Sequence, residues 1–361
     1  MFLFRNNSLS FSDSGFSADK VVYDSPVKTP PEIREAIKLG LHMNLDNEKE
    51  IKIVKEHIGS QSLTELPVIG LRINPVVGGG NIAAMSTATK QSKFGLPLTE
   101  DTRERLVQIY ADNPWMTGIH IHVGSQGVPM ARFVSGTRVL LDFIKDIEGR
   151  CGDQIKTVDI GGGLSTSYTQ PGEPDEFTFQ KYRDFLTREV PELFSGKYRV
   201  VTEFGRSLCL KAGTSLTRIE FVKDWAEESN PILLTHLGTN QFPRETYVPQ
   251  VWRHRFSLYT SQGQTKEGDL VMVDVAGPLC FQGDYQARDV ELPRPEEGDI
   301  LAIHDTGAYT MSMYCKFNSI RASPVYGYWR EGGQVKFVCY KTRETVEECL
   351  QFWGLENSQT L

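Results

Sequence analysis

No run in the sequence approaches the roughly 18 apolar residues that span a bilayer, so we expect no membrane partner. The six cysteines are scattered and show no CxxC spacing, which favours reduced thiols in a cytoplasmic protein over a disulfide framework. The net charge of −7 argues against a general nucleic-acid binder, which would show a basic face, but it leaves room for a local basic pocket for a small anion. The apolar part of the Ser-rich start is too short for a signal peptide. An organellar transit peptide is the one targeting signal that the segment still allows.

Up to about residue 207, short apolar runs alternate with amphipathic helical patterns. The expected strands are 21–25, 42–46, 67–75, 118–125, 156–163 and 198–208. The expected helices are 31–40, 47–59, 99–113, 131–150 and 179–194. Strands that are each followed by a helix predict a parallel sheet, and this many repeats favour a (β/α) barrel over an open sheet. Chemistry in such a barrel lies at the C-terminal ends of the strands.

From residue 208 onward, the apolar runs have strand length and are separated by turn signals, and only 345–353 has a helical pattern. We therefore expect an unstructured or atypical start at 1–20, a barrel at 21–207, and an all-β barrel or sandwich at 208–361. The predicted fold class is α/β followed by all-β.

Three of the expected barrel strands end in residues suited to chemistry. In DIGGG, Gly161, Gly162 and Gly163 can bring backbone N–H groups close to a phosphate, although a tight turn explains them equally well. In EFGRS, Arg206 can complement a phosphate, and Glu203 can accept a hydrogen bond from a ring N–H. An internal ion pair is the structural alternative for these two residues.

His120 and His122 point to the same side of the strand that ends in HVGSQ. A histidine at such a position is usually a buried core residue. Because a phosphate-binding loop is expected nearby, an imidazole that stacks on an aromatic cofactor is an alternative to that interpretation. The two histidines could be zinc ligands, but no third ligand follows at a convincing spacing, so we predict no metal. In the β region, Cys280, Asp284 and Tyr309 lie in turns, where each alone has a structural explanation.

The motifs HVGSQ, DIGGG, EFGRS, CFQGD and DTGAYTMSMYCKFNSIR occur in this order, together with SPVKTPPEI and SKFGLP. In combination they resemble the fold-type III pyridoxal-phosphate decarboxylases that act on diaminopimelate, ornithine or arginine. The resemblance covers nearly the whole chain from about Phe16, and it is strongest to diaminopimelate decarboxylases. It implies an alanine-racemase-like TIM barrel followed by a β domain, pyridoxal 5'-phosphate as cofactor, and decarboxylation of a basic or diamino acid in lysine biosynthesis or polyamine metabolism.

The resemblance also implies roles for individual residues. His122 would stack on the pyridine ring, and Glu203 would pair with its nitrogen. The phosphate would be held by Ser125, Gly161, Gly162, Gly163, Gly205, Arg206 and Tyr309. Cys280 would act as the catalytic proton donor in the neighbouring subunit of a homodimer, with Asp284 beside it. Arg244 and Tyr247 are approximate matches for substrate-binding residues, because their spacing is one residue shorter than the pattern.

The sequence departs from the family pattern in two places. No segment matches the strand that carries the Schiff-base lysine, so we expect a barrel without its first two strands, with open edges at 21–24 and 199–203. Lys28 opens a helix, and Lys90 and Lys93 are expected in loops, so none replaces that lysine. Phe281 stands where diaminopimelate decarboxylases carry a glutamate, and an apolar side chain cannot offset an ammonium charge. The substrate is therefore left as a basic or diamino acid.

Two functions follow from these residues. The leading hypothesis is a decarboxylase whose N-terminal segment is absent from this chain. The alternative is a non-catalytic homologue that binds and regulates other proteins, as antizyme inhibitor does. A racemase is disfavoured by HVGSQ and by Cys280.

Overall fold

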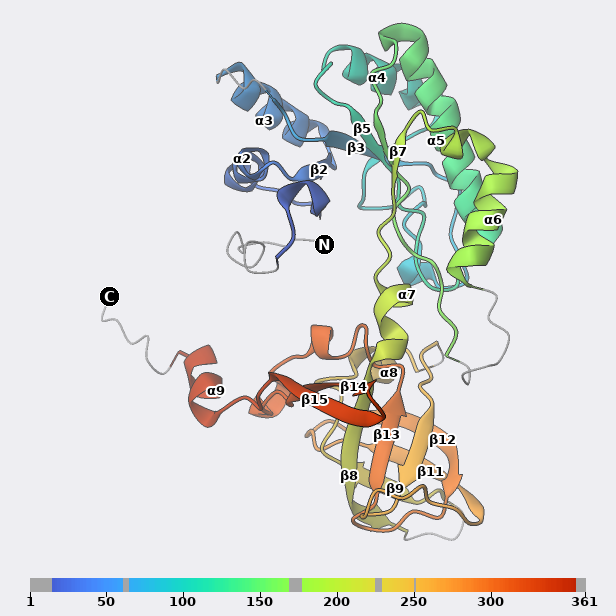
Figure 1. Cartoon of the computed structure of the whole chain (residues 1–361), viewed down its shortest axis with the longest axis vertical. Helices are drawn as coiled ribbons and strands as arrows, with labels where there is room; N and C mark the ends of the chain where they lie inside the picture. Colours follow the sequence, from blue (N-terminus) through green and yellow to red (C-terminus); the bar gives the residue numbers. More distant parts are fainter. Residues whose placement is uncertain (1–14, 61–64, 169–176, 225–228, 250, 355–361) are drawn as a thin grey trace. The chain divides into compact units, whose positions relative to one another are not determined.

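The computed structural model describes residues 15–60, 65–168, 177–224, 229–249 and 251–354 (Figure 1). Its contacts divide the chain into two compact units. The first contains the described residues up to Leu208 except Tyr168, and the second contains Tyr168 and the described residues from Cys209 onward.

The first unit is built on a parallel sheet. Its strands lie side by side in the order β1-β2-β3-β5-β6-β7, and β4 pairs with β3. Their bounds are β1 Val22–Asp24, β2 His42–Leu45, β3 Ile69–Asn74, β4 Leu96–Pro97, β5 Gly118–His120, β6 Thr157–Asp159 and β7 Arg199–Val201. Every residue of β2, β3, β5 and β6 is buried, as expected for parallel strands covered on both faces.

Helices follow the strands of this sheet. They are α2 Pro30–Leu39, α3 Glu48–Gly59, α4 Glu100–Ala111, α5 Met130–Cys151, α6 Phe179–Glu189 and α7 Arg206–Cys209, with short 3-10 turns at Ala18–Lys20, Ala83–Met85 and Pro191–Phe194. Local sequence explains their ends: Thr29 and Glu32 form a capping box before α2, and Gly40 ends it with a φ of 75°. The alternation of strand and helix confirms the predicted (β/α) architecture, although residues 1–14 of the expected atypical start lie outside the described residues.

Polar residues of the sheet meet because of its register. Arg72 on β3 is paired with His120 on β5, which is paired with Asp159 on β6. Two residues earlier, Asn44 is paired with Gly70, where a Cβ would lie 2.6 Å from the Asn44 Oδ1. The small residue on β3 therefore makes room for the Asn44 amide inside the sheet.

The second unit is mostly antiparallel. Its six-stranded sheet has the order β10-β13-β8-β9-β11-β12, and β14 and β15 form a separate hairpin. The bounds are β8 Thr214–Lys223, β9 Ile232–Thr235, α8 Pro243–Tyr247, β10 Phe256–Tyr259, β11 Leu270–Ala276, β12 Tyr285–Pro293, β13 Ile300–His304, β14 Val325–Glu331, β15 Gln334–Lys341 and α9 Val346–Phe352, with 3-10 turns at Leu210–Ala212, Met311–Met313 and Phe317–Ser319. Its core includes the fully buried Ile219, Leu233, Val273, Val275 and Leu301.

Some elements differ from the sequence predictions. α6 ends at Glu189, short of the predicted residue 194, because Pro191 cannot continue the α-helix. β5 stops at His120, since the chain then leaves the sheet to form the loop that carries His122. Among the described residues, no helix is both long and apolar enough to cross a bilayer.

Lys28 is a structural residue in the first unit. Its ammonium lies 2.8 Å from the Glu50 carboxylate, and both side chains are almost completely buried. The ammonium also donates to the Ser25 carbonyl at 2.6 Å, and Glu50 accepts a bond from the Asp46 backbone N–H. The pair thus connects the end of β1 to the start of α3. This is a structural role, which is what we expected for Lys28. Lys90 and Lys93 are exposed and lie between β3 and β4.

We expect Lys28→Met to lower the free energy of unfolding by about 3–5 kcal/mol, because it leaves the buried Glu50 carboxylate without its cation. Lys52→Met is the matched control, since its exposed pair with Glu56 contributes at most about 1 kcal/mol. Urea unfolding followed by the helical circular dichroism signal measures both. Equal unfolding midpoints for the two variants would contradict the assignment.

Candidate active site

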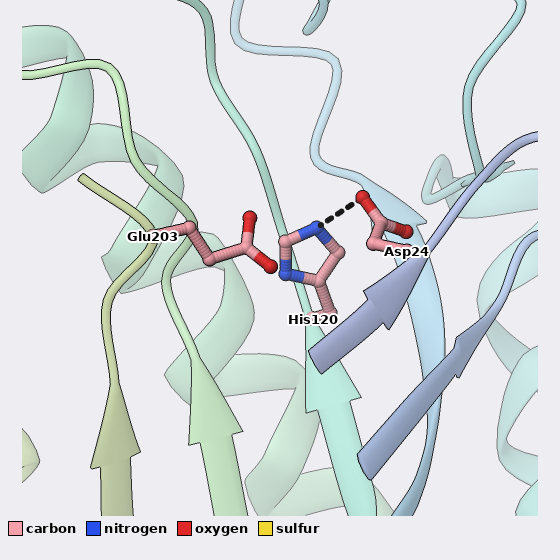
Figure 2. Close-up of side chains that lie close together, drawn as sticks. All are labelled: Asp24, His120 and Glu203. Carbon is pink, nitrogen blue, oxygen red and sulfur yellow. Dashed lines mark ion pairs between the residues drawn. The ribbon is translucent and has the colours of Figure 1, made fainter. Parts of the chain in front are cut away.

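Three strands of the first unit deliver charged groups to one buried cluster. The imidazole of His120 is fully buried, with Nδ1 3.3 Å from Oδ1 of Asp159 and Nε2 3.6 Å from Oδ2 of Asp24. Asp24, His120 and Glu203 lie together in Figure 2, with the imidazole between the two carboxylates. The His120 ring, from a strand in the middle of the sheet, therefore faces acidic groups from both edges of the sheet: Asp24 on β1 and Glu203 just after β7.

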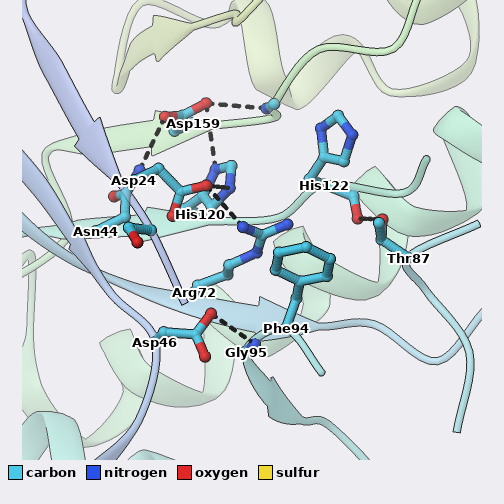
Figure 3. Close-up of polar contacts among 12 residues, drawn as sticks. Asp24, Asn44, Asp46, Arg72, Thr87, Phe94, Gly95, His120, His122 and Asp159 are labelled. Atoms are coloured by element: carbon cyan, nitrogen blue, oxygen red, sulfur yellow. Dashed lines mark hydrogen bonds and ion pairs between the residues drawn. The ribbon is translucent and has the colours of Figure 1, made fainter. Parts of the chain in front are cut away.

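Each carboxylate of this cluster has a second partner. Arg72 donates from a guanidinium nitrogen to Oδ2 of Asp24 at 2.7 Å, and the guanidinium stacks on the Phe94 ring with 4.3 Å from Cζ to the centroid (Figure 3). Asp159 accepts bonds from the Asn44 amide at 3.2 Å and from the Gly161 backbone N–H at 2.9 Å. The charge cluster is thus bonded directly to the first glycine of the DIGGG loop.

The protonation states of the cluster follow from burial and opposing charges. Burial alone lowers the pKa of His120, but the carboxylates of Asp159, Glu203 and Asp24 outweigh it and raise that pKa well above 6.5. Burial would raise the pKa of Asp24, yet the His120 and Arg72 charges hold it far below its usual range. His120 is therefore a cation between carboxylates that remain ionised.

Glu203 behaves differently from Asp24 and Asp159. Burial raises its pKa, and the negative charges of Asp159 and Asp24 add to this rise against the His120 cation. Its Oε1 is buried and has no hydrogen-bond partner within the described residues. Asp24 also has one buried oxygen without a hydrogen-bond partner among these residues, Oδ1, but its other oxygen is bonded to the Arg72 guanidinium. Glu203 has no such bond to Arg72, so its carboxyl group is the better placed of the two to receive a ligand's N–H.

Asp24, His120 and Glu203 also bring one ligand-type atom each within 4.8 Å of one another, a spacing compatible with a metal ion. A divalent cation there would face the Arg72 guanidinium, which already neutralises Asp24 at 2.7 Å. We therefore interpret Asp24, His120 and Glu203 as groups that bind protons, and we assign no metal ion to them.

His122 lies apart from His120 in Figure 3 and has different partners. Its Nδ1 accepts a bond from the Gly162 backbone N–H at 3.2 Å, and its carbonyl accepts one from the Thr87 hydroxyl. Burial and the nearby Arg72 charge lower the pKa of His122 to about 3. The ring is therefore neutral and held against the glycine loop.

The glycine loop packs backbone against backbone. A Cβ on Gly162 would lie 2.1 Å from the Glu203 carbonyl oxygen, and one on Gly163, whose φ is 98°, would lie 1.8 Å from the Gly124 carbonyl oxygen. Side chains at these positions are excluded by the neighbouring strand ends even before any ligand is considered. The same contacts bring His122, Gly162 and Glu203 into one place.

The other residues singled out in this unit lie close by in sequence. Ser125 is partly buried, and its backbone N–H donates to the Met85 carbonyl at 3.0 Å. Gly205 is exposed, and the buried Arg206 is the first residue of α7, three residues after Glu203.

The second unit gathers the remaining candidates into two groups. The Arg244 guanidinium lies 3.9 Å from the centroid of the Tyr309 ring and 5.2 Å from that of Trp252. Tyr309 has a φ of 60°, which is uncommon for a bulky residue and is typical of functional turns. The structure thus places Arg244, predicted to bind substrate, against Tyr309, predicted to bind phosphate.

Cys280, Phe281 and Asp284 share the turn after β11. Asp284 is buried, and its two oxygens accept bonds from Thr239 and from the Leu279 backbone N–H at 2.6 to 2.8 Å, so it holds the turn together. Cys280 is exposed, and the Phe281 ring lies 6.3 Å from the Tyr247 ring. The residue that follows Cys280 is therefore one member of an aromatic pair and carries no charge.

Sequence reasoning missed most of the charge cluster. Asp24, Asn44 and Arg72 are polar residues in strands that are largely apolar. A polar residue in a strand predicted to be buried was the available signal, because such a group needs a partner. The partners themselves lie far apart in the sequence and are set by the strand register.

We expect the stability difference between the wild type and His120→Gln to shrink as the pH rises. The folded state raises the pKa of His120 above its ordinary 6.5, so the stabilisation is complete below that pH and is lost as the pH climbs through the folded-state value. Urea unfolding of both proteins between about pH 6 and pH 9 measures the difference. A difference that widens with rising pH would contradict a cationic His120.

Comparison with known proteins gives the family of the chain. A family model described as the pyridoxal binding domain of pyridoxal-dependent decarboxylases matches residues 10–209. The diaminopimelate decarboxylase of Methanothermobacter thermautotrophicus is 30% identical over 342 residues, which are 94% of this chain and 75% of that protein. That of Aquifex aeolicus is 28% identical over 327 residues, which are 90% of this chain and 73% of that protein.

Solved structures give the same result. The diaminopimelate decarboxylase of Methanocaldococcus jannaschii is 25% identical, has a TM-score of 0.78 and is matched over 94% of this chain and 75% of that chain. That of Helicobacter pylori, complexed with L-lysine, is 23% identical, covers 95% of this chain and 80% of that chain, and shares the fold with a TM-score of 0.80. The predicted fold class, an incomplete alanine-racemase-like barrel followed by an all-β domain, is confirmed. With more than half of its length matched by the family model, the chain belongs to the pyridoxal-dependent decarboxylases.

Proposed function

We propose that the chain acts in the pyridoxal-phosphate-dependent decarboxylation of a basic or diamino acid. The observation that carries the proposal is the buried, unpartnered Oε1 of Glu203 next to His122 and the glycine loop. Relatives named as diaminopimelate decarboxylases support the reaction class, and they do not favour the regulatory alternative.

The residues of the first unit fit such a cofactor. The neutral His122 ring would lie on the pyridine face, and the Gly161–Gly163 loop with Ser125, Gly205 and Arg206 would hold the phosphate. By the family resemblance, the Tyr309 hydroxyl would also hold the phosphate. When bound, pyridoxal phosphate supplies an electron sink for the charge that remains after carbon dioxide leaves.

Glu203 would hold a proton against the ring nitrogen of the cofactor. Its raised pKa means that the carboxyl group holds a proton among the neighbouring carboxylates, and a ring nitrogen could share that proton. His120 stays cationic between Asp24 and Asp159, so those two carboxylates have little tendency to take the proton instead. The cluster thereby sets which group near the cofactor carries the exchangeable proton.

The remaining roles follow from the family resemblance. We infer that Cys280 donates a proton to the substrate in the neighbouring subunit of a homodimer, and that Arg244 and Tyr247 bind substrate. Asp284 would contribute mainly by holding the Cys280 turn, because its two oxygens already accept bonds from the backbone N–H groups of Thr239 and Leu279. The free cysteines agree with a cytoplasmic location.

Glu203→Gln tests the cofactor site. We expect it to weaken pyridoxal phosphate binding about tenfold, because the amide keeps the shape but cannot pair as an anion with a protonated ring nitrogen. The control is Glu192→Gln, an exposed residue of the turn at Pro191–Phe194. Equilibrium dialysis measures both affinities. Unchanged affinity in Glu203→Gln would remove the observation on which the proposal rests.

Cys280→Ala tests the reaction. With pyridoxal phosphate added, we expect carbon dioxide release from diaminopimelate, lysine, ornithine or arginine, and formation of the amine product at least about tenfold slower in Cys280→Ala. Cys339→Ala, which removes another exposed thiol of the same unit, should leave the product rate unchanged. Absence of release from all four amino acids would count against the decarboxylase proposal.

A further inference from the structure

The thiol of Cys280 is held by one side chain. The amide nitrogen of Asn318 lies 3.1 Å from its sulfur, the amide oxygen lies 3.3 Å from the sulfur, and the same oxygen lies 3.3 Å from the Cys280 backbone nitrogen. A single amide therefore contacts both the main chain and the reactive atom of Cys280.

The orientation of this amide is fixed by chemistry. A backbone N–H can only donate, so the Asn318 atom that faces the Cys280 nitrogen must be the oxygen. The NH₂ group is then left beside the sulfur. No rotation of the amide would satisfy the backbone N–H and still remove the N–H donor from the thiol.

The amide matches both protonation states of the sulfur. Its oxygen can accept from the S–H of the thiol, and its nitrogen can donate to the thiolate that remains after the proton has left. Both atoms are already within reach, so neither state requires the side chain to turn.

Asn318 sits on a segment with several anchors. It has a left-handed φ of 55°, which asparagine tolerates better than most residues, and Ser319 follows with a φ of 53°. The Cys315 backbone N–H donates to the Asn240 carbonyl at 2.9 Å, and Lys316 forms an ion pair with Glu344. The segment is therefore held directly before the residue that contacts the thiol.

The opposite side of the contact is equally anchored. Asp284 bonds the N–H and hydroxyl of Thr239 and the N–H of Leu279, the residue before Cys280. A Cβ on Gly238 or on Gly277 would collide with the Asp284 carboxylate, at 2.8 and 2.4 Å. Cys280 and Asn318 are thus presented by two separately braced loops.

We propose that Asn318 is a positioning residue that holds the Cys280 thiol by bonding its backbone N–H and its sulfur with the same amide. The catalytic meaning of this contact rests on the proposed role of Cys280 as proton donor. The contact itself concerns only the second unit and does not depend on cofactor.

Asn318→Asp separates the two halves of the contact. The carboxylate keeps an oxygen for the backbone N–H but replaces the donor at the sulfur with a negative charge. We expect iodoacetamide to alkylate Cys280 at least about threefold more slowly, because the thiolate is the species that reacts. Mass spectrometry of each cysteine peptide gives the rate, with the exposed Cys339 as the reference within the same sample. An unchanged ratio of Cys280 to Cys339 would overturn the proposal.

Asn318→Gly is the second variant. Glycine accepts the left-handed backbone, so the loop keeps its path while the amide is lost. We expect hydrogen exchange at the Cys280 backbone N–H to accelerate in Asn318→Gly and to stay slow in Asn318→Asp. Equal exchange rates in the wild type, Asn318→Asp and Asn318→Gly would refute the bond from the Cys280 backbone N–H to the Asn318 side chain. Since neither measurement uses pyridoxal phosphate, failure of the decarboxylase assay would leave both results interpretable.

Discussion

The buried His120 cation is the constraint on which the first unit depends. A charged ring with no exposed surface needs carboxylates at ion-pair distance, and these come from β1 and β6 on either side of β5. Their positions are fixed by strand register, since a shift by one residue would turn Asp24 or Asp159 to the opposite face. The cluster therefore helps to specify the sheet in addition to serving a site.

The charges of the cluster explain why Glu203 differs from its neighbours. Asp24 and Asp159 are balanced by Arg72 and His120, which leaves a third carboxylate without a cation of its own. An ionised Glu203 would be a surplus charge in a buried place, so it holds a proton until a positive group arrives. A protonated ring nitrogen would be such a group, and it would need no further protein cation.

The sequence allowed the alternation of strands and helices to be predicted because apolar periodicity and caps such as Thr29 and Gly40 are local signals. It did not predict β12 or β14, because their polar and apolar residues do not alternate with the two-residue period of a strand. The glycine loop and Glu203 were found because they form compact motifs. Arg72 and Asn318 were not assigned a role, since their partners lie on other strands or loops and only the folded backbone brings them together.

Not every residue of a recognisable motif carries the same functional information. The glycines of DIGGG are required by the carbonyls of Gly124 and Glu203, so packing alone explains them. The Oε1 of Glu203 has no such explanation, because burying an acceptor without a donor is costly and the fold gains nothing from it. The functional signal of this site therefore lies less in its conspicuous glycines than in the Glu203 carboxyl group, which has a buried oxygen without a donor among the described residues.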